Sequence, residues 1–178
     1  MKKIVAIAYL VVAIAFTSCI KEEIKSYTGK PVLEFDAAVL NAATVPFTYY
    51  VTTRNSPYGL TTTTTNSTVI TRTQTTPVKL RVNLVGPQSS TDQIVSYLTS
   101  TTVVPVSPNL LAVSGTHFTT TGTFTIPAGS SFGELVINVL NSGASSTSPR
   151  EVHLELTGNA NLLPSVNYGK LGVRIAQN

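Results

Sequence analysis

The chain of 178 residues has one cysteine and no tryptophan, and only 11% of its residues are charged. One cysteine cannot form an internal disulfide, so we expect a hydrophobic core to stabilise the fold. No cluster of lysine and arginine marks a nucleic-acid footprint, and we expect no nucleic-acid partner. The formal net charge of +4 includes Lys2 and Lys3, and without them it is +2.

The first residues have the composition of a secretory signal. The apolar run from Ile4 to Phe16 follows two lysines and meets charged residues from Lys21 onwards. A membrane-spanning helix needs roughly 20 apolar residues, so this run is too short to cross a bilayer. A basic segment, a short apolar region and small residues at its end form a signal peptide. We predict a signal peptide over residues 1–18.

The tetrapeptide Phe16-Thr17-Ser18-Cys19 resembles a bacterial lipobox, with small residues just before the cysteine. The resemblance implies cleavage before Cys19, a diacylglyceryl group on its sulfur and acylation of the new amino terminus. Several acyl chains give stable membrane anchoring where one is marginal. Residues 19–30 then form a lipidated flexible tether, and residues 31–178 form the domain.

Lys21, Glu22 and Glu23 follow the predicted lipidated cysteine. They resemble the export signal of surface lipoproteins in Bacteroidetes-type bacteria. That resemblance implies an outer-membrane lipoprotein exposed on the cell surface. The alternative is a solvated charged tether.

Short apolar alternations separated by Gly, Pro, Asn and Ser predict an all-β domain. The segment 133–141 is more apolar throughout than the other predicted strands, with Leu135, Ile137 and Val139 on one face, which suits a central strand covered on both sides. About eight or nine strands favour an antiparallel, immunoglobulin-like β-sandwich, with a small barrel as the alternative. The clearest predicted strands are 77–86, 133–141, 150–158 and 171–176, and weaker ones are 32–36, 45–52, 68–73, 93–99 and 122–127.

Two connections stand out. The threonine-rich segment 59–68 is predicted to be a surface hairpin tip or an irregular strand. The long segment Thr101–Gly115 either carries function or crosses between the sheets.

The second half of the chain contains "GTHFTTTGTFTIPAGSSFGELVINVLN" and "PREVHLELTGN". This pattern resembles the Calx-β domain: a Gly-x-x-aromatic segment, a strand ending at Pro-Ala-Gly, an apolar strand, and an acid-containing strand. It is also similar to uncharacterised Bacteroidetes lipoprotein domains found beside outer-membrane glycan transporters. The resemblance covers roughly residues 77–175.

Calx-β domains bind calcium with an acidic residue before the aromatic. Here His117 stands at that position before Phe118, while Glu151 matches an acidic position of the later strand. Calcium takes six to eight oxygen ligands. Because one hard-oxygen ligand is missing, we do not carry calcium binding over, and we expect no metal and no cofactor.

Glu151, His153 and Glu155 alternate along one predicted strand, so their side chains share a face. Two carboxylates beside an imidazole can hold a metal or support acid–base chemistry. The favoured interpretation is a solvent-exposed face of an alternating strand, with cross-strand pairing of Glu155 to Arg174, or of Glu151 to a basic neighbour.

No catalytic motif is evident. Glu34 and Asp36 share a strand face, but glycosidase carboxylates need distinct environments, and we interpret this pair as solvated. The chain has no phosphate-binding glycine loop. We therefore expect a protein that is not an enzyme.

Aromatic residues close together in the sequence suggest a ligand-binding patch. Tyr49 and Tyr50 point to opposite faces of a strand, so one belongs to the core. The candidate ligand-binding residues are Tyr50, Arg54 and Tyr58, and the alternative is local packing at the sandwich edge. Tyr97 and Tyr168 are interpreted as packing residues. The lack of tryptophan counts against strong sugar stacking.

Together these features predict a non-catalytic surface lipoprotein. The resemblance implies an accessory or binding component of an outer-membrane glycan-uptake system, with a transporter complex or a glycan as partner. The alternative is a structural or adhesive envelope module that binds other proteins.

Replacing Cys19 with alanine removes the only thiol of the chain. Without its acyl chains the protein loses stable membrane attachment. We expect the variant to lack metabolic labelling by an alkyne fatty acid and to leave the membrane fraction. Unchanged labelling of the variant would contradict the lipobox prediction.

Overall fold

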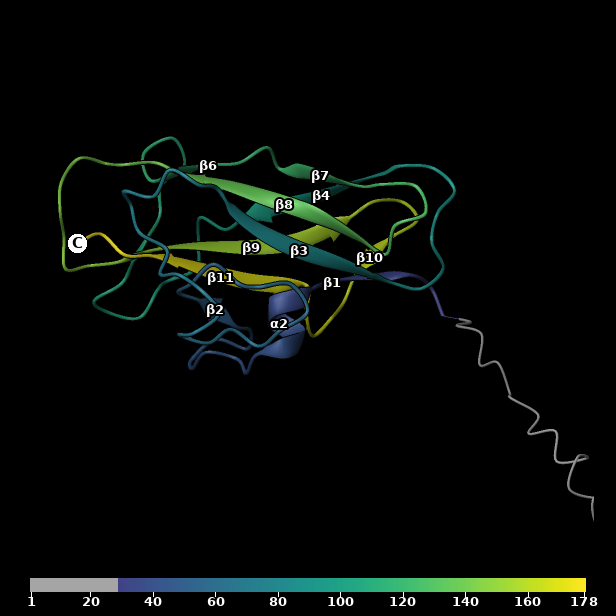
Figure 1. The fold of residues 1–178 in the computed structure, drawn as a ribbon, viewed down its shortest axis with the longest axis horizontal. Helices are drawn as coiled ribbons and strands as arrows, with labels where there is room; N and C mark the ends of the chain where they lie inside the picture. Colours follow the sequence, from purple (N-terminus) through teal and green to yellow (C-terminus); the bar gives the residue numbers. More distant parts are fainter. Residues whose placement is uncertain (1–28) are drawn as a thin grey trace, which may run out of the picture.

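The computed structural model describes residues 29–178, which form two β-sheets packed face to face (Figure 1). One sheet has the strand order β10-β1-β3-β8-β6, and the other has the order β2-β11-β9-β4-β7, with β5 also paired to β9. The elements are β1 (Val32–Phe35), α2 (Asp36–Leu40), β2 (Val51–Thr52), β3 (Val78–Val85), β4 (Gln93–Thr99), β5 (Leu110–Leu111), β6 (Phe118–Thr119), β7 (Thr123–Ile126), β8 (Phe132–Val139), β9 (Arg150–Gly158), β10 (Leu163–Pro164) and β11 (Lys170–Ile175).

The predicted sandwich is confirmed, with more strands than expected. Eleven strands occur in the described part of the chain, because four pieces of two residues each join the seven longer ones. The short strands β5, β6 and β10 carry no alternation that a sequence pattern can detect. Most pairings are antiparallel, but β10, β2 and β5 each pair in parallel with a strand distant in sequence.

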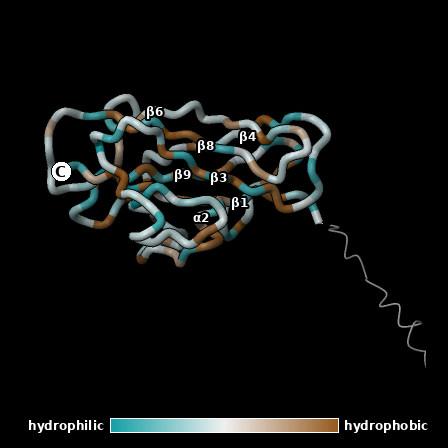
Figure 2. Tube along the Cα trace, in the orientation of Figure 1, coloured by the Kyte–Doolittle hydropathy of each residue, from teal (hydrophilic) through white to brown (hydrophobic). Residues whose placement is uncertain are grey.

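Alternating apolar residues place the core between the two sheets. In β3, Val78, Leu80 and Val82 are at most 2% exposed. On β8, Leu135 and Ile137 are fully buried, whereas the opposite face of that strand is only half-buried. The expectation that this strand is covered on both sides is therefore wrong. Figure 2 shows hydrophobic residues along the strands and mainly polar or neutral residues on the connections.

A single turn of helix, α2, interrupts the predicted strand after Phe35. Its two alanines, Ala37 and Ala38, are buried against the sheets. The Asp36 carboxylate accepts hydrogen bonds from Gly59 N at 2.7 Å and from Asn83 Nδ2 at 2.9 Å. Asp36 is 7% exposed, so its interpretation as a solvated residue is wrong.

The threonine-rich segment 59–68 forms the tip of an irregular hairpin, as one of the two expectations had it. Its base is closed by an antiparallel bridge between Arg54 and Val69. Weak strands predicted over 45–52 and 68–73 shrink to β2 and isolated bridges. No helix among residues 29–178 is long and apolar enough to cross a membrane.

Gly158 ends β9 with a φ of +75°, and a Cβ atom there would lie 2.1 Å from the Leu162 carbonyl oxygen. We expect Gly158→Ala to lower the free energy of unfolding by more than about 1 kcal/mol, because it adds a backbone clash to an unfavourable φ. Chemical denaturation measures this loss.

Gly143→Ala is the matched control, since Gly143 has a φ of +87° and no atom within 4 Å of the added Cβ. It carries only the backbone cost and should destabilise less. Equal losses for both variants would contradict the clash at Gly158.

Candidate functional site

The first half of β9 is covered on both faces, which removes Glu151 and His153 from solvent. Their exposed fractions are 0% and 2%, so the expected solvent-facing arrangement of these two residues is wrong. One face packs in the sandwich core, and connecting segments cover the other. The segment 100–112, which includes β5, is hydrogen-bonded to β9 at both of its ends. Ser100 N donates to the His153 carbonyl, and Ala112 N donates to the Glu151 carbonyl, each at 2.8 Å.

The Glu151 carboxylate lies at the centre of a buried polar network. Arg174 Nε donates to Oε1 at 2.8 Å, Asn109 Nδ2 donates to Oε1 at 3.0 Å, and His153 Nε2 lies 3.0 Å from Oε2. Burial alone would raise the pKa of Glu151, but the hydrogen bonds from His153 and Arg174 outweigh it and lower the pKa. Glu151 is therefore a carboxylate held by three donors.

Strand register explains which charges pair. Arg174 lies opposite Glu151, and Lys170 lies opposite Glu155. Lys170 Nζ is 3.3 Å from Glu155 Oε1, and both side chains are about half exposed. Glu151 thus has the basic neighbour that was expected, whereas the expected pairing of Glu155 with Arg174 is wrong.

Two aromatic rings cover the outer side of His153. The Tyr49 hydroxyl lies 3.0 Å from His153 Nδ1. Phe47 stacks on Tyr49 with 5.3 Å between ring centroids and approaches the imidazole at 5.0 Å. Backbone bonds from Thr44 N to the Tyr49 carbonyl and from Phe47 N to the Thr44 carbonyl bend the chain into this position.

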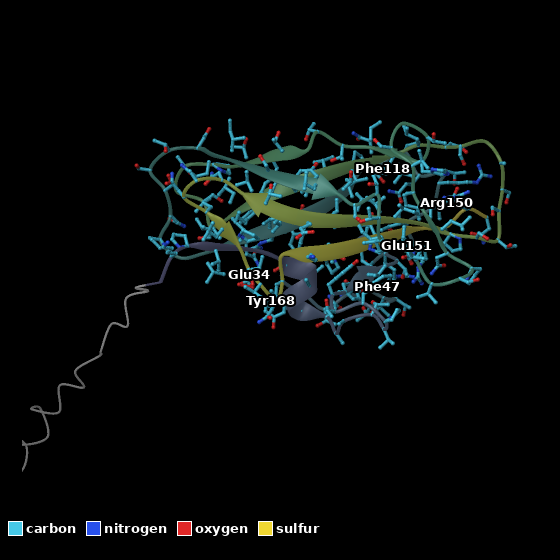
Figure 3. All side chains as sticks on the ribbon, turned by 180° about the vertical axis from the view of Figure 1, so that it is seen from behind. Glu34, Phe47, Phe118, Arg150, Glu151 and Tyr168 are labelled. Carbon is cyan, nitrogen blue, oxygen red and sulfur yellow. The ribbon has the colours of Figure 1, made fainter. Side chains whose placement is uncertain are left out.

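A groove around Lys170 opens beside this aromatic cover, and we call it the Lys170 groove. It consists of three adjoining hollows of about 340, 190 and 170 Å³, all lined by Lys170. Tyr49 lines the two larger hollows, and Tyr168 lines the largest. Further lining residues are Ser100, Thr102, Glu155, Val166 and Asn167. In Figure 3, Phe47 and Tyr168 lie on the side of β11 away from Phe118.

Burial governs the chemistry available to Tyr49. Desolvation, followed by the charges of Glu151 and Glu155, raises the pKa of the phenol. A hydroxyl, an imidazole and a carboxylate in series form the geometry of a nucleophilic triad, but such a nucleophile needs an activated hydroxyl. The raised pKa makes the Tyr49 phenolate harder to form, and the hydroxyl is hydrogen-bonded to His153.

The three predicted ligand-binding residues lie apart, and no hydrogen bond or ring contact joins them. Tyr50 packs against the core, and Arg54 Nε donates to Ser67 Oγ at 2.9 Å, which holds the threonine-rich tip. Tyr58 donates to Glu134 Oε1 at 2.8 Å and lines a separate hollow of about 400 Å³. Ligand binding by Tyr50, Arg54 and Tyr58 stays a prediction.

Glu134 is shared by two donors in that separate hollow. Besides the Tyr58 hydroxyl, Lys79 Nζ lies 3.2 Å from Glu134 Oε2. The hydrogen bond from Tyr58 lowers the pKa of Glu134 against the raising effect of burial. The hydrogen of the Tyr58 hydroxyl is therefore already used in a hydrogen bond to the Glu134 carboxylate.

The remaining acidic and histidine positions do not assemble into a centre. Glu34 is half-buried, and burial raises its pKa, while Asp36 is bound to its own partners. His117 Nδ1 accepts a hydrogen bond from Val113 N at 3.0 Å, and burial, with the charge of Arg150, lowers its pKa. Within residues 29–178 no group of three His, Cys, Asp or Glu side chains could hold a metal ion. Cys19, Lys21, Glu22 and Glu23 lie outside the described residues.

Sequence reasoning missed Phe47, Tyr49 and Lys170 as site residues and took Tyr168 as a packing residue. One signal was present. The chain has few charges, yet Glu151 and His153 alternate on a strand whose expected partner strand carries Arg174. The aromatic cover arises from an irregular turn segment that leaves no periodic pattern.

No known family profile matches the chain, and no curated protein does. Among solved structures, the apo form of the Calx CBD1 domain is similar with a TM-score of 0.52 and 14% identity, over 84% of this chain and 99% of that domain. A two-domain protein of unknown function from Bacteroides fragilis NCTC 9343 matches with a TM-score of 0.49 and 10% identity, over 83% of this chain and 45% of that protein.

A candidate carbohydrate-binding protein from Bacteroides ovatus ATCC 8483 is similar with a TM-score of 0.41 and 10% identity, over 57% of this chain and 31% of that protein. The chain therefore spans less than half of either Bacteroides protein. The similarity to the Calx CBD1 domain shows that this domain has a Calx-β-like β-sandwich fold.

Replacing Glu151 with glutamine removes the buried charge that three donors hold. We expect a loss of about 1.5–3 kcal/mol in the free energy of unfolding at pH 7, the range for hydrogen bonds to charged groups. Glu155→Gln on the same strand is the control, and as an exposed pair it should cost about 0–1 kcal/mol. Urea denaturation measures both.

The pH dependence gives a second readout. Since the folded pKa of Glu151 lies below its ordinary value of 4.5, its stabilisation is present above that value. It is lost as the pH falls through the folded pKa. The gap between wild type and Glu151→Gln should therefore narrow in acid. A gap that stays constant as the pH falls well below 4.5 would contradict the assignment.

Proposed function

We propose that the protein is a non-catalytic, lipid-anchored lipoprotein of the Bacteroidetes type that binds a glycan in the Lys170 groove at the cell surface. In this proposal it is an accessory component of an outer-membrane glycan-uptake system. The acyl chains on Cys19 confine it to the membrane, and the tether of residues 19–30 raises its effective concentration near a transporter.

The observation that carries the proposal is the lining of the Lys170 groove. Tyr49 and Tyr168 supply aromatic surface on either side of the largest hollow. Lys170, Glu155 and the hydroxyls of Ser100 and Thr102 supply donors and acceptors beside it. Few polar groups placed around an apolar surface are typical of small-molecule sites, and the largest hollow of the groove, about 340 Å³, lies at the lower end of their usual range of volumes.

The non-catalytic assignment is supported by the state of the carboxylates. Glycosidases need two carboxyl groups free to act on either side of the scissile bond. Glu151 is fully buried and occupied by three donors, and Glu155 is paired with Lys170. This leaves one exposed carboxylate at the groove.

A specific observation favours the alternative, a structural or adhesive module that binds other proteins. The connection 101–115 exposes several large apolar side chains, of which Val104 is 83% and Val113 is 54% exposed. Exposed apolar surface on a connecting segment is typical of protein contacts. This alternative predicts a protein partner and no sugar binding.

Tyr168→Ala tests the glycan site. Removing the ring from the groove should weaken the binding of an oligosaccharide by about tenfold, the effect of one lost aromatic contact. The four hexasaccharides to be titrated are maltohexaose, xylohexaose, laminarihexaose and mannohexaose. Tyr168→Phe keeps the ring and should retain most of the affinity. Isothermal titration calorimetry measures both.

The same titration with Tyr58→Ala locates the site. If Tyr58→Ala abolishes binding and Tyr168→Ala does not, the ligand occupies the hollow beside Glu134 instead. If no saccharide binds, but a carboxyl-terminal tag recovers a protein partner from outer membranes, the adhesive alternative replaces the glycan proposal.

A further inference from the structure

The buried carboxylate of Glu151 fixes the direction of each hydrogen bond between itself and the Lys170 groove. An ionised carboxylate only accepts hydrogen bonds. His153 Nε2 lies 3.0 Å from Glu151 Oε2, so this ring nitrogen carries the hydrogen and donates. In a neutral imidazole the other nitrogen, Nδ1, is then an acceptor.

The assignment of His153 determines what Tyr49 does. The Tyr49 hydroxyl lies 3.0 Å from His153 Nδ1, an acceptor, so the phenol donates its only hydrogen inwards. Its oxygen keeps lone pairs for other partners but has no hydrogen left to offer. Tyr49 and His153 both line the hollow of about 190 Å³, and we infer that the oxygen between their rings is accessible from the groove.

Reversing the chain of hydrogen bonds is unfavourable. If Tyr49 turned its hydrogen towards a ligand, His153 Nδ1 would lose its donor beneath the aromatic cover. An unpaired buried acceptor lowers the population of that arrangement by roughly ten- to a hundredfold. Turning the imidazole into its other tautomer would remove the donor from Glu151, which is 0% exposed.

We propose that the Arg174–Glu151–His153 chain holds the Tyr49 hydroxyl as a dedicated hydrogen-bond acceptor, so that the groove selects ligands that present a free hydroxyl donor to it. The proposal rests on the proposed function and names the chemistry that the groove recognises. His153 and Glu151 act as positioning residues, and Tyr49 is the residue that touches the ligand.

The neighbouring charges complete the specificity. Lys170 has three donors and no acceptor, and Glu155 beside it only accepts. A sugar hydroxyl can accept from the ammonium of Lys170 while it donates to Tyr49. An ether or a methylated oxygen can do only the first of these. The groove therefore distinguishes a free hydroxyl from an alkylated one at the same position.

The tautomer is tested without any ligand. Long-range ¹H–¹⁵N correlation spectra at neutral pH report which ring nitrogen carries the hydrogen, and the chain has only two histidines. We expect His153 to be protonated at Nε2 alone. Protonation at Nδ1, alone or together with Nε2, would overturn the inference and leave glycan binding untouched.

The selection is tested with the tightest-binding of the four hexasaccharides and its monomethyl ethers, each of which loses one hydroxyl donor. At one position we expect methylation to lower the affinity of the wild type about tenfold, and that of Tyr49→Phe less than about twofold. The control Tyr97→Phe removes a hydroxyl bound to Thr120, away from the groove.

Each outcome of these titrations either supports or overturns the inference. Equal methylation effects in wild type and Tyr49→Phe overturn the inference while the affinity itself upholds the proposed function. A loss of selectivity in Tyr97→Phe as well assigns the effect to general loosening and overturns it too. If none of the four hexasaccharides binds the wild type, the proposed function and the ligand selection both fail.

Discussion

The buried negative charge of Glu151 is the constraint on which the outer face of the β2-β11-β9-β4-β7 sheet depends. Taking a carboxylate out of water costs several kcal/mol unless donors replace the lost hydration. Its three donors come from β11, from β9 itself and from the connection before β5. The charge therefore holds three separate parts of the chain in one arrangement, and in the described residues no buried side-chain polar atom lacks a partner.

The aromatic cover follows from this arrangement. His153 Nε2 is hydrogen-bonded to Glu151, and His153 Nδ1 is hydrogen-bonded to the Tyr49 hydroxyl. Phe47 stacks on the Tyr49 ring. The wall of the Lys170 groove is thus an extension of a buried ion pair. The proposed binding surface and the stability of the fold are connected here, because the imidazole that holds the Tyr49 hydroxyl also satisfies the charge beneath it.

The sequence allowed the sandwich and its long strands to be predicted, and it allowed little of the candidate site. Strands such as β3, β9 and β11 have a clear period of two, and their predicted bounds agree closely with the structure. The burial of Glu151 has a different origin, because alternation gives only the side of the strand on which a residue lies. Whether that side meets solvent depends on which loop returns over it, and this is decided by contacts distant in sequence. The positions of Lys170 and Tyr168 in the groove likewise depend on contacts distant in sequence.

The parallel pairings of β1 with β10 and of β2 with β11 have a consequence for biosynthesis (Figure 1). Strands from the beginning of the domain pair with segments between residues 163 and 173, which lie far along the chain. Contacts between such distant segments are slow to form. A nascent chain that lacks β10 and β11 cannot complete either sheet, so it cannot adopt the full sandwich. With this connectivity, the two sheets can be completed only after the whole domain has been synthesised.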